Sequence, residues 1–328
     1  MTNKKGEQMH TVINSKKKLK KEKVSFKTKL KNFFSQWQIQ AMVIPGILFM
    51  FVFTYIPIYG LVIAFKSYTV IDTLQDAPWV GLENFRIILS DRYFIQSVIN
   101  TLGISLLKLA IGFFIPIILA IMIFEVKSGP LKKLVQTISY LPHFLSWIIL
   151  GGMLISWMST TGLMNQILSM VGLSQGANHL LDADKYWLIA VFSDIWKEAG
   201  WGTILYLATM AKIDPTYYEA ARIDGANKFS QIKNITLPML VPIISLNLIL
   251  NISGLLGSNL DQTLVLMNSQ NQAKSEVINS YVYRMGLVQG DFSYATAVGL
   301  GISVISIILL GITNMATKKM NDGQSVIF

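Results

Sequence analysis

Apolar stretches long enough to cross a lipid bilayer alternate with shorter polar stretches along most of the chain. The first, residues 41–65, contains no charged residue over 25 positions. As an α-helix it would be about 37 Å long at 1.5 Å per residue, which is enough to span a bilayer core of about 30 Å. The same pattern recurs, and six transmembrane helices are predicted at about 41–65, 98–124, 134–157, 186–210, 237–256 and 295–315. The predicted fold class is therefore an all-α integral membrane protein.

Composition supports this class and excludes several kinds of site. Of the 328 residues, 52% are hydrophobic and 14% are charged, and the mean hydropathy is +0.48; soluble domains carry about 25% charged residues. The chain contains no cysteine, which excludes disulfides and thiolate metal ligands. Its three histidines, His10, His143 and His179, are far apart in sequence, so the sequence predicts no metal site.

Much of the formal net charge of +10 lies in the first 38 residues. Between Lys4 and Lys31 there are eleven lysines and two acidic residues. Next to a membrane span, such a block is typical of a solvated tail held on the cytoplasmic side. Contact with anionic lipid headgroups, or a regulatory role, is the alternative, and nucleic acid is not a predicted partner. Residues 1–38 are therefore interpreted as a cytoplasmic tail, 39–317 as the transmembrane domain and 318–328 as a second cytoplasmic tail.

The distribution of basic residues between the loops predicts the orientation in the membrane. With the N-terminus inside, the inner loops and C-terminal tail hold nine Lys and Arg residues, and the outer loops hold six. The basic N-terminal tail adds to the inner side, as the positive-inside rule requires. Both termini and the polar segment 212–238 are therefore predicted to face the cytoplasm.

The segment 212–238 is unusually polar for a connection between two transmembrane helices. Asp214 is a suitable helix N-cap, and Pro215 fits a first helical turn because its missing N–H is not needed there. Gly225 permits a turn without steric penalty. A second helix is predicted to follow, before Pro238 opens the fifth span. The expected product is a helical hairpin at the cytoplasmic face that another protein can hold.

Seven residues of this hairpin carry a family resemblance. They follow the pattern EAA-x3-G-x9-I-x-LP, with every spacing intact: Glu219, Ala220, Ala221, Gly225, Ile235, Leu237 and Pro238. This pattern is similar to the EAA loop of ATP-binding-cassette importer permeases. The flanking sequence "WGTILYLATMAKIDPTYY" resembles the carbohydrate-uptake, maltose-type branch, and "SYLPHFLSW" and "SEVINSYVYRMGLVQGDFSYATAVGL" resemble its LplB-type polysaccharide and oligosaccharide permeases.

The resemblance implies a type I importer fold in a bacterial cytoplasmic membrane. It implies that the loop, including Asp224, is a coupling helix that docks on a separate ATPase subunit. The implied partners are a second permease that forms a heterodimer with this one, two ATPases, an extracytoplasmic sugar-binding protein and membrane lipids. ATP and Mg²⁺ are expected on the ATPases, because the chain has no G-x4-G-K-[ST] phosphate loop. No catalytic residue and no cofactor on this subunit are predicted, so the chain is not expected to be an enzyme.

Polar and aromatic residues inside the spans are candidates for a substrate pathway, because charges there usually face protein or water. The predicted set lies in the fourth span and along the fifth span and its continuation: Asp194, Trp196, Lys197, Trp201, Asn247, Asn251 and Asn259. The three asparagines, at spacings of four and eight, are expected to line one helix face. Amides both donate to and accept from sugar hydroxyls, and aromatic rings stack on sugars. In the alternative interpretation, Asp194 and Lys197 neutralise each other on one helix face, and the asparagines only join helices.

Three functions remain open from the sequence. The first is the permease subunit of an ATP-driven importer of an oligosaccharide or polysaccharide fragment, delivered by an extracytoplasmic binding protein. The second is the same machine with a non-sugar cargo. The third is a secondary carrier that needs no ATPase, which uptake driven by an ion gradient with this chain alone would support.

Overall fold

This computed structural model describes residues 35, 37–173, 176–257 and 259–318. The predicted basic block and nearly all of both tails lie outside the described residues. The described part is helical, with one isolated antiparallel bridge between Lys66 and Trp79. It divides after Gly60 into two units, which are described separately.

The first apolar segment is helical over its whole predicted length. It consists of α3 (Trp37–Met50), the π-helix η1 (Phe51–Tyr55), α4 (Ile56–Ile58) and the 3₁₀-helix η2 (Tyr59–Phe65). The π-helical turn lies directly before Pro57, whose nitrogen cannot donate a hydrogen bond. The helix therefore continues past the proline with a local change of register.

Four helical stretches of the described chain are long and apolar enough to cross a membrane: Trp37–Phe65, Arg92–Glu125, Lys228–Ser253 and Phe292–Lys318. The second comprises α6 (Arg92–Leu107), the π-helix η3 (Lys108–Gly112) and α7 (Phe114–Glu125); the fourth is α18. The predicted fourth span is the 25-residue helix α11 (Tyr186–Met210), which is less apolar because it carries Asp194, Lys197 and Glu198.

The predicted third span, 134–157, is not one straight helix. It consists of α8 (Pro130–Tyr140), the 3₁₀-helix η4 (Leu141–Phe144) and α9 (Trp147–Trp157), and the two halves meet at 99°. Leu145 and Ser146 have extended backbones, and the Ser146 hydroxyl accepts a hydrogen bond from the Ile149 N–H at 3.3 Å. Ser146 is thus the N-cap of a new helix that runs in a new direction. The apolar residues next to Ser146 give no sign of this helix start.

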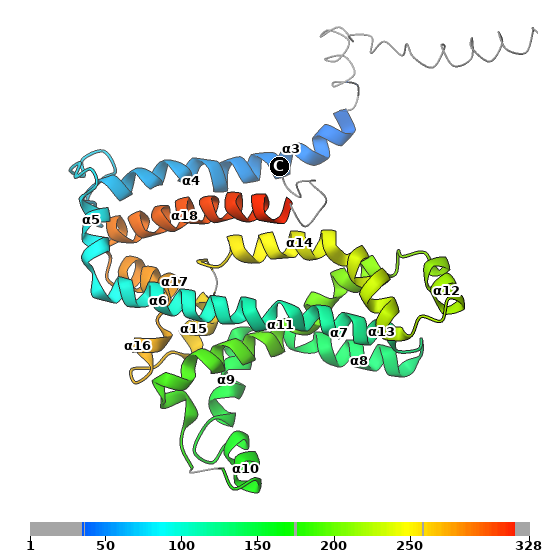
Figure 1. Cartoon of the computed structure of the whole chain (residues 1–328). Helices are drawn as coiled ribbons and strands as arrows, with labels where there is room; N and C mark the ends of the chain where they lie inside the picture. The colour runs from blue at the N-terminus through cyan, green and yellow to red at the C-terminus, as the bar shows by residue number, and fades with distance from the viewer. Residues whose placement is uncertain (1–34, 36, 174–175, 258, 319–328) are drawn as a thin grey trace, which may run out of the picture. The chain divides into compact units, whose positions relative to one another are not determined.

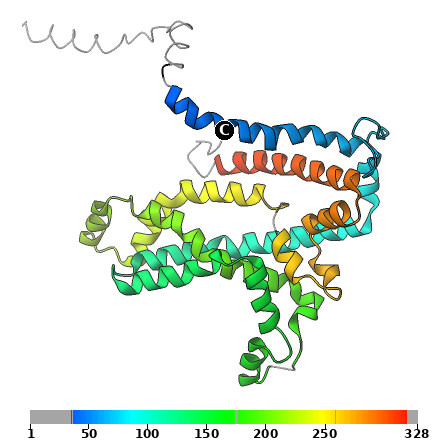
Figure 2. The same cartoon turned by 180° about the vertical axis from the view of Figure 1, so that it is seen from behind.

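Helix α11 is the centre of the second unit. It packs most extensively on α7 and also on α6, α8, η4 and α14 (Leu237–Ser253), while α14 packs on α18. Figures 1 and 2 show α7, α8, α11 and α14 running together toward the hairpin at α12, with α15, α16 and α17 at the opposite end of these helices. The buried side chains between them include Ile117, Tyr206, Met210 and Leu240.

Shorter elements complete the second unit. They are α5 (Glu83–Ser90), α10 (Leu163–Met170), η5 (His179–Leu181), η6 (Ala183–Lys185), α12 (Pro215–Ile223), α13 (Lys228–Gln231), η7 (Ile232–Thr236), α15 (Leu260–Leu266), α16 (Gln272–Ser275), α17 (Ile278–Tyr283) and η8 (Arg284–Val288).

Gly200 permits the close approach of α11 to α8. A Cβ at Gly200 would lie 1.8 Å from the Ser139 carbonyl oxygen, so the Gly200→Ala variant requires the helices to separate. We expect it to lower the free energy of unfolding by about 1–3 kcal/mol, which thermal unfolding of the purified protein measures. The control is Gly152→Ala in α9, where no atom lies within 4 Å of the added Cβ. Equal stability of the two variants would contradict this explanation.

Candidate functional site

The polar connection between α11 and α14 begins with a capped helix, α12. Asp214 has an extended backbone, and its carboxylate accepts a hydrogen bond from the Thr216 N–H at 2.9 Å. Hydrogen bonds from the Thr216 backbone and side chain hold the pKa of Asp214 below its usual value. Pro215 occupies the first turn. The predicted start of the hairpin is therefore observed.

The turn of the hairpin depends on the backbone conformation of Gly225. Its φ is +77°, in the left-handed region that favours glycine. This conformation lets the Gly225 N–H reach the Arg222 carbonyl at 3.1 Å and the Ala226 N–H reach the Ala221 carbonyl at 2.8 Å. Such bonds satisfy carbonyls at a helix C-terminus.

The second arm of the hairpin is continuous with the fifth span. Asn227 caps α13 by accepting a bond from the Ser230 N–H at 2.8 Å, and α13 runs through η7 into α14 without interruption. As predicted, α14 begins at Leu237 with Pro238 in its first turn, but no break separates it from the preceding helix, and the continuous helical stretch begins at Lys228. The π-helical turn η7 ends at Thr236, two residues before Pro238, and accommodates the missing N–H donor of the proline.

The hairpin exposes both polar and apolar side chains. Glu219, Ala220, Asp224, Gly225 and Pro238 are exposed, and three further residues of the predicted set are partly buried: Ala221, Ile235 and Leu237. Outside that set, Ile223 is 87% exposed and Phe229 is 74% exposed. Large exposed apolar groups next to charged ones are typical of a surface that binds another protein.

Two side-chain contacts hold the hairpin against the helices. The Tyr218 hydroxyl and the Thr236 hydroxyl lie 3.0 Å apart and join α12 to η7. The Lys228 ammonium lies 2.5 Å from a carboxylate oxygen of Glu125 at the end of α7. A movement of the hairpin is therefore linked to the ends of two membrane helices.

A cavity of about 1030 Å³ lies farther along the same helices. Its walls come from α6, η3, α7, α9, α11, α14, α15, α17 and the segment between α14 and α15. The polar and aromatic side chains that line it are Ser105, Lys108, Phe113, Trp147, Asp194, Glu198, Trp201, Tyr206, Asn247, Asn251, Asn259, Asp261, Gln262 and Asn279.

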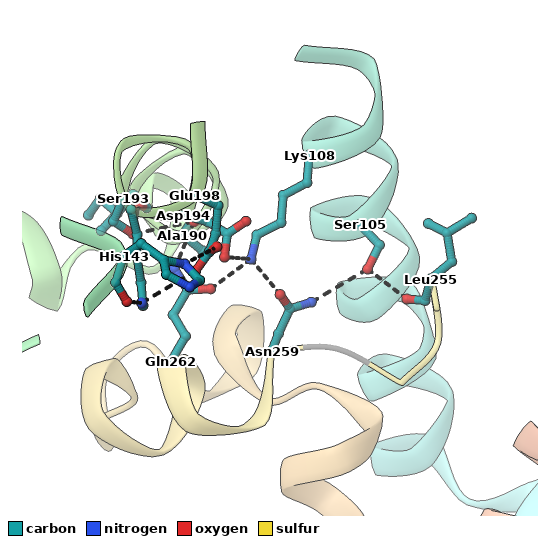
Figure 3. A network of polar contacts seen from close by, with 12 residues as sticks. Ser105, Lys108, His143, Ala190, Ser193, Asp194, Glu198, Leu255, Asn259 and Gln262 are labelled. Atoms are coloured by element: carbon teal, nitrogen blue, oxygen red, sulfur yellow. Dashed lines mark hydrogen bonds and ion pairs between the residues drawn. The ribbon is translucent and has the colours of Figure 1, made fainter. Parts of the chain in front are cut away.

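Lys108 is the centre of a polar network in this cavity (Figure 3). Its side chain is 13% exposed, and its ammonium lies 3.0 Å from Asp194 Oδ1. The ammonium also donates to Gln262 Oε1 at 2.9 Å and to Asn259 Oδ1. The Asn259 amide lies 3.5 Å from the Ser105 hydroxyl. The network thus joins the second span to α11 and α15.

The suggested pairing of Asp194 with Lys197 is wrong. Asp194 pairs with Lys108, while Lys197 lies 3.3 Å from Glu198 and donates to the His143 carbonyl at 2.6 Å. Residues three apart on a helix can pair, but here Asp194 binds a lysine of η3, and Lys197 binds the adjacent Glu198 and a carbonyl of η4. Lys197 is buried and does not line the cavity.

The two predicted tryptophans differ in their surroundings. Trp196 packs on Trp157 with ring centroids 5.8 Å apart and does not line the cavity. Trp201 lines it, and one face of its indole stacks on the His143 ring at 4.3 Å. Only Trp201 of this pair has the position that a pathway residue requires.

The three predicted asparagines line the cavity but do not share one helix face. Asn247 and Asn251 belong to α14, where Asn247 donates to the Tyr206 hydroxyl at 3.0 Å. Asn259 lies beyond the end of α14 and has a φ of +82°, so it reaches the cavity from the turn before α15. The periodicity argument for Asn259 is therefore wrong, because the helix ends at Ser253.

Sequence reasoning did not single out Gln262 or His143. Gln262 is buried, and its amide donates to the Ala190 carbonyl at 2.7 Å and the Ser193 hydroxyl at 2.9 Å. His143 Nδ1 lies 2.8 Å from Glu198 Oε2. Their partners are more than 50 positions away in sequence, so no local pattern indicates either role.

Comparison with known proteins identifies the family. Residues 112–322, more than half of the chain, match the family described as "Binding-protein-dependent transport system inner membrane component". The chain belongs to this family. As an inner membrane component of a transport system, the permease is a multi-pass membrane protein and a transport subunit, not an enzyme.

Relatives and solved structures agree with this assignment. The permease is 37% identical to the "Polygalacturonan/rhamnogalacturonan transport system permease protein YteP" of Bacillus subtilis (strain 168), over 88% of this chain and 89% of the relative. It is 38% identical to "Protein LplB" of the same organism, over 86% and 88%. A bacterial transporter described as importing the acidic polysaccharide alginate contains a chain with a TM-score of 0.81 and 35% identity, over 88% of this chain and 98% of that one. The predicted type I importer fold and carbohydrate-uptake branch are confirmed.

Proposed function

We propose that this permease is the transmembrane subunit of an ATP-driven importer and that its cargo is an oligosaccharide or polysaccharide fragment. The observation that carries the proposal is the exposed hairpin at Glu219–Gly225, which sits at the end of the helices that also form the cavity. The names of similar proteins support the cargo class. One refers to polygalacturonan and rhamnogalacturonan, and another refers to alginate.

The proposal includes partners that the chain itself does not contain. Two ATPase subunits bind ATP and Mg²⁺ and hold the hairpin, and a second, non-identical permease completes the membrane pathway. An extracytoplasmic binding protein delivers the glycan; a related alginate transporter is described in complex with such a protein. In this arrangement both termini and the hairpin face the cytoplasm, as the basic residues favour.

Reversing the charge of Glu219 tests the coupling role. In a complex reconstituted in proteoliposomes with its ATPases, second permease and binding protein, we expect Glu219→Lys to reduce ATP-dependent glycan uptake by about tenfold or more. Glu219 is an exposed carboxylate in the middle of α12 that can pair with a basic group across an interface, and a positive charge in its place disfavours docking. The control is Glu83→Lys, an exposed glutamate in the first turn of α5, which should retain uptake.

Three results would contradict the proposal in different ways. Coupled ATP hydrolysis and uptake in the Glu219→Lys complex would exclude this loop as the coupling element. Uptake of a non-sugar solute, with no glycan transported, would exclude the cargo class. Uptake by the permease alone, driven by an ion gradient, would indicate a secondary carrier.

A further inference from the structure

The described residues that line the cavity offer no free cation to an acidic ligand. Its charged lining residues are Lys108, Asp194, Glu198 and Asp261. Lys108 is the one basic residue among the described lining residues, and it lies within an ion pair. The charge of this wall therefore bears directly on which glycans can pass.

The three N–H donors of the Lys108 ammonium already have acceptors within the protein. A lysine ammonium has three N–H donors and no acceptor. Here three oxygens surround it, from Asp194, Asn259 and Gln262, as Figure 3 shows. A glycan carboxylate would have to displace one of these groups and would then meet Asp194 itself.

The remaining charges of the wall do not attract an anion either. Glu198 lines the cavity with a side chain that is 43% exposed, whereas its cationic partner Lys197 is 9% exposed and does not line the cavity. Asp261 is exposed and forms no ion pair with any residue of the described chain. The two ion pairs balance, and Asp261 leaves the wall with an excess negative charge.

The groups that face the cavity suit an uncharged, hydroxyl-rich ligand. Carboxylates accept hydrogen bonds from hydroxyls, and the amides of Asn247 and Asn251 can both donate and accept. Trp147 and Trp201 add aromatic rings on which a sugar can stack. The carboxylates of uronate sugars, in contrast, would lose their hydrating water in the cavity. No cation of the described wall would compensate for that loss, so their binding would be unfavourable.

We propose that this permease is selective for neutral glycans and that Asp194, by neutralising Lys108, excludes glycans that carry a carboxylate on each sugar. The proposal rests on the proposed function and narrows its cargo. The proposed cargo differs from the acidic polysaccharides, polygalacturonan and alginate, to which the names of relatives refer. The preference for neutral glycans is inferred from the charge of this chain's own cavity wall and not from its relatives. Specificity of this kind comes from unfavourable contacts with the wrong ligand.

Binding to the complete permease complex in lipid nanodiscs, without the binding protein, tests this selectivity. The probes are oligogalacturonates of three to six sugars and the same oligomers after carboxyl reduction, which converts each uronate to neutral galactose. Tryptophan fluorescence reports binding, since Trp147 and Trp201 line the cavity. We expect each reduced oligomer to bind at least about tenfold more tightly than its acidic parent, because like charges in contact disfavour binding.

Two variants distinguish the role of Asp194 from a general charge effect. Asp194→Asn keeps an oxygen that accepts from Lys108 but removes the balancing charge, so the preference for the neutral oligomers should fall about tenfold. Asp184→Asn removes an exposed carboxylate in η6, outside the cavity, and should leave the preference unchanged. An equal preference in the wild-type complex, or an unchanged preference in Asp194→Asn, would overturn the proposal. Failure of every oligomer to bind would count against the oligosaccharide cargo itself.

Discussion

ATP-dependent uptake is expected to fall at least about tenfold when Gly225 is replaced by valine. The Gly225 φ of +77° is a conformation that costs an ordinary L-residue about 1–2 kcal/mol, and a β-branched residue fits it worst. A difference of 1.4 kcal/mol is about tenfold in population, so fewer hairpins would have the turn that presents Glu219. Uptake by the reconstituted complex measures the effect, and the amount of permease in the membrane should not change, because the substitution lies outside the long apolar helices.

The matched variant is Gly225→Asn. Asparagine tolerates the left-handed region better than other non-glycine residues, and no atom lies within 4 Å of a Cβ at this position. We expect it to retain most of the uptake of the wild-type complex. Normal uptake in Gly225→Val would contradict the conformational explanation, and equal losses in both variants would instead indicate contact between residue 225 and a partner subunit.

The hairpin was predictable because its signals are local. A capping aspartate, a proline in the first turn and a glycine at the turn lie within twelve positions, and each acts on its immediate neighbours. The bend at Ser146 was not predicted, because hydropathy averaged over 134–157 gives no direction for the chain and hides the change from the amphipathic α8 to the apolar α9. A proline within a helical pattern usually ends or kinks the helix, because it has no N–H to donate. At Pro238 the helix continues, since the π-helical turn η7 accommodates the missing hydrogen bond.

The cavity was predictable only in part, for a related reason. Charged and amide residues within apolar spans mark the elements that face it, and Asp194, Trp201, Asn247, Asn251 and Asn259 do line it. Their partners depend on how distant helices pack. The ion pair of Lys108 with Asp194 joins residues 86 positions apart in sequence, and no single-helix spacing specifies it.

Removal of the Lys108 ammonium is expected to have a large effect on the stability of the permease. Breaking a buried ion pair by deleting one partner typically costs about 3–5 kcal/mol, because the other charge remains without compensation. Asp194 is 29% exposed toward the cavity, so we expect Lys108→Met to lower the free energy of unfolding by about 3 kcal/mol, at the low end of that range. Thermal unfolding of the purified permease measures it. Lys185→Met removes an ion pair with Asp182 whose side chains are both more than 40% exposed, and should cost about 1 kcal/mol or less.

The double variant Lys108→Met/Asp194→Leu identifies the cause of that loss. If the uncompensated carboxylate is responsible, removing it as well should restore much of the stability lost in the single variant. Gln262 keeps its bonds to Ala190 and Ser193, so α15 remains attached to α11 in either variant. A double variant as unstable as Lys108→Met would show instead that the bonds from Lys108 to Asn259 and Gln262 hold the cavity wall together. A single variant as stable as the wild type would contradict both explanations.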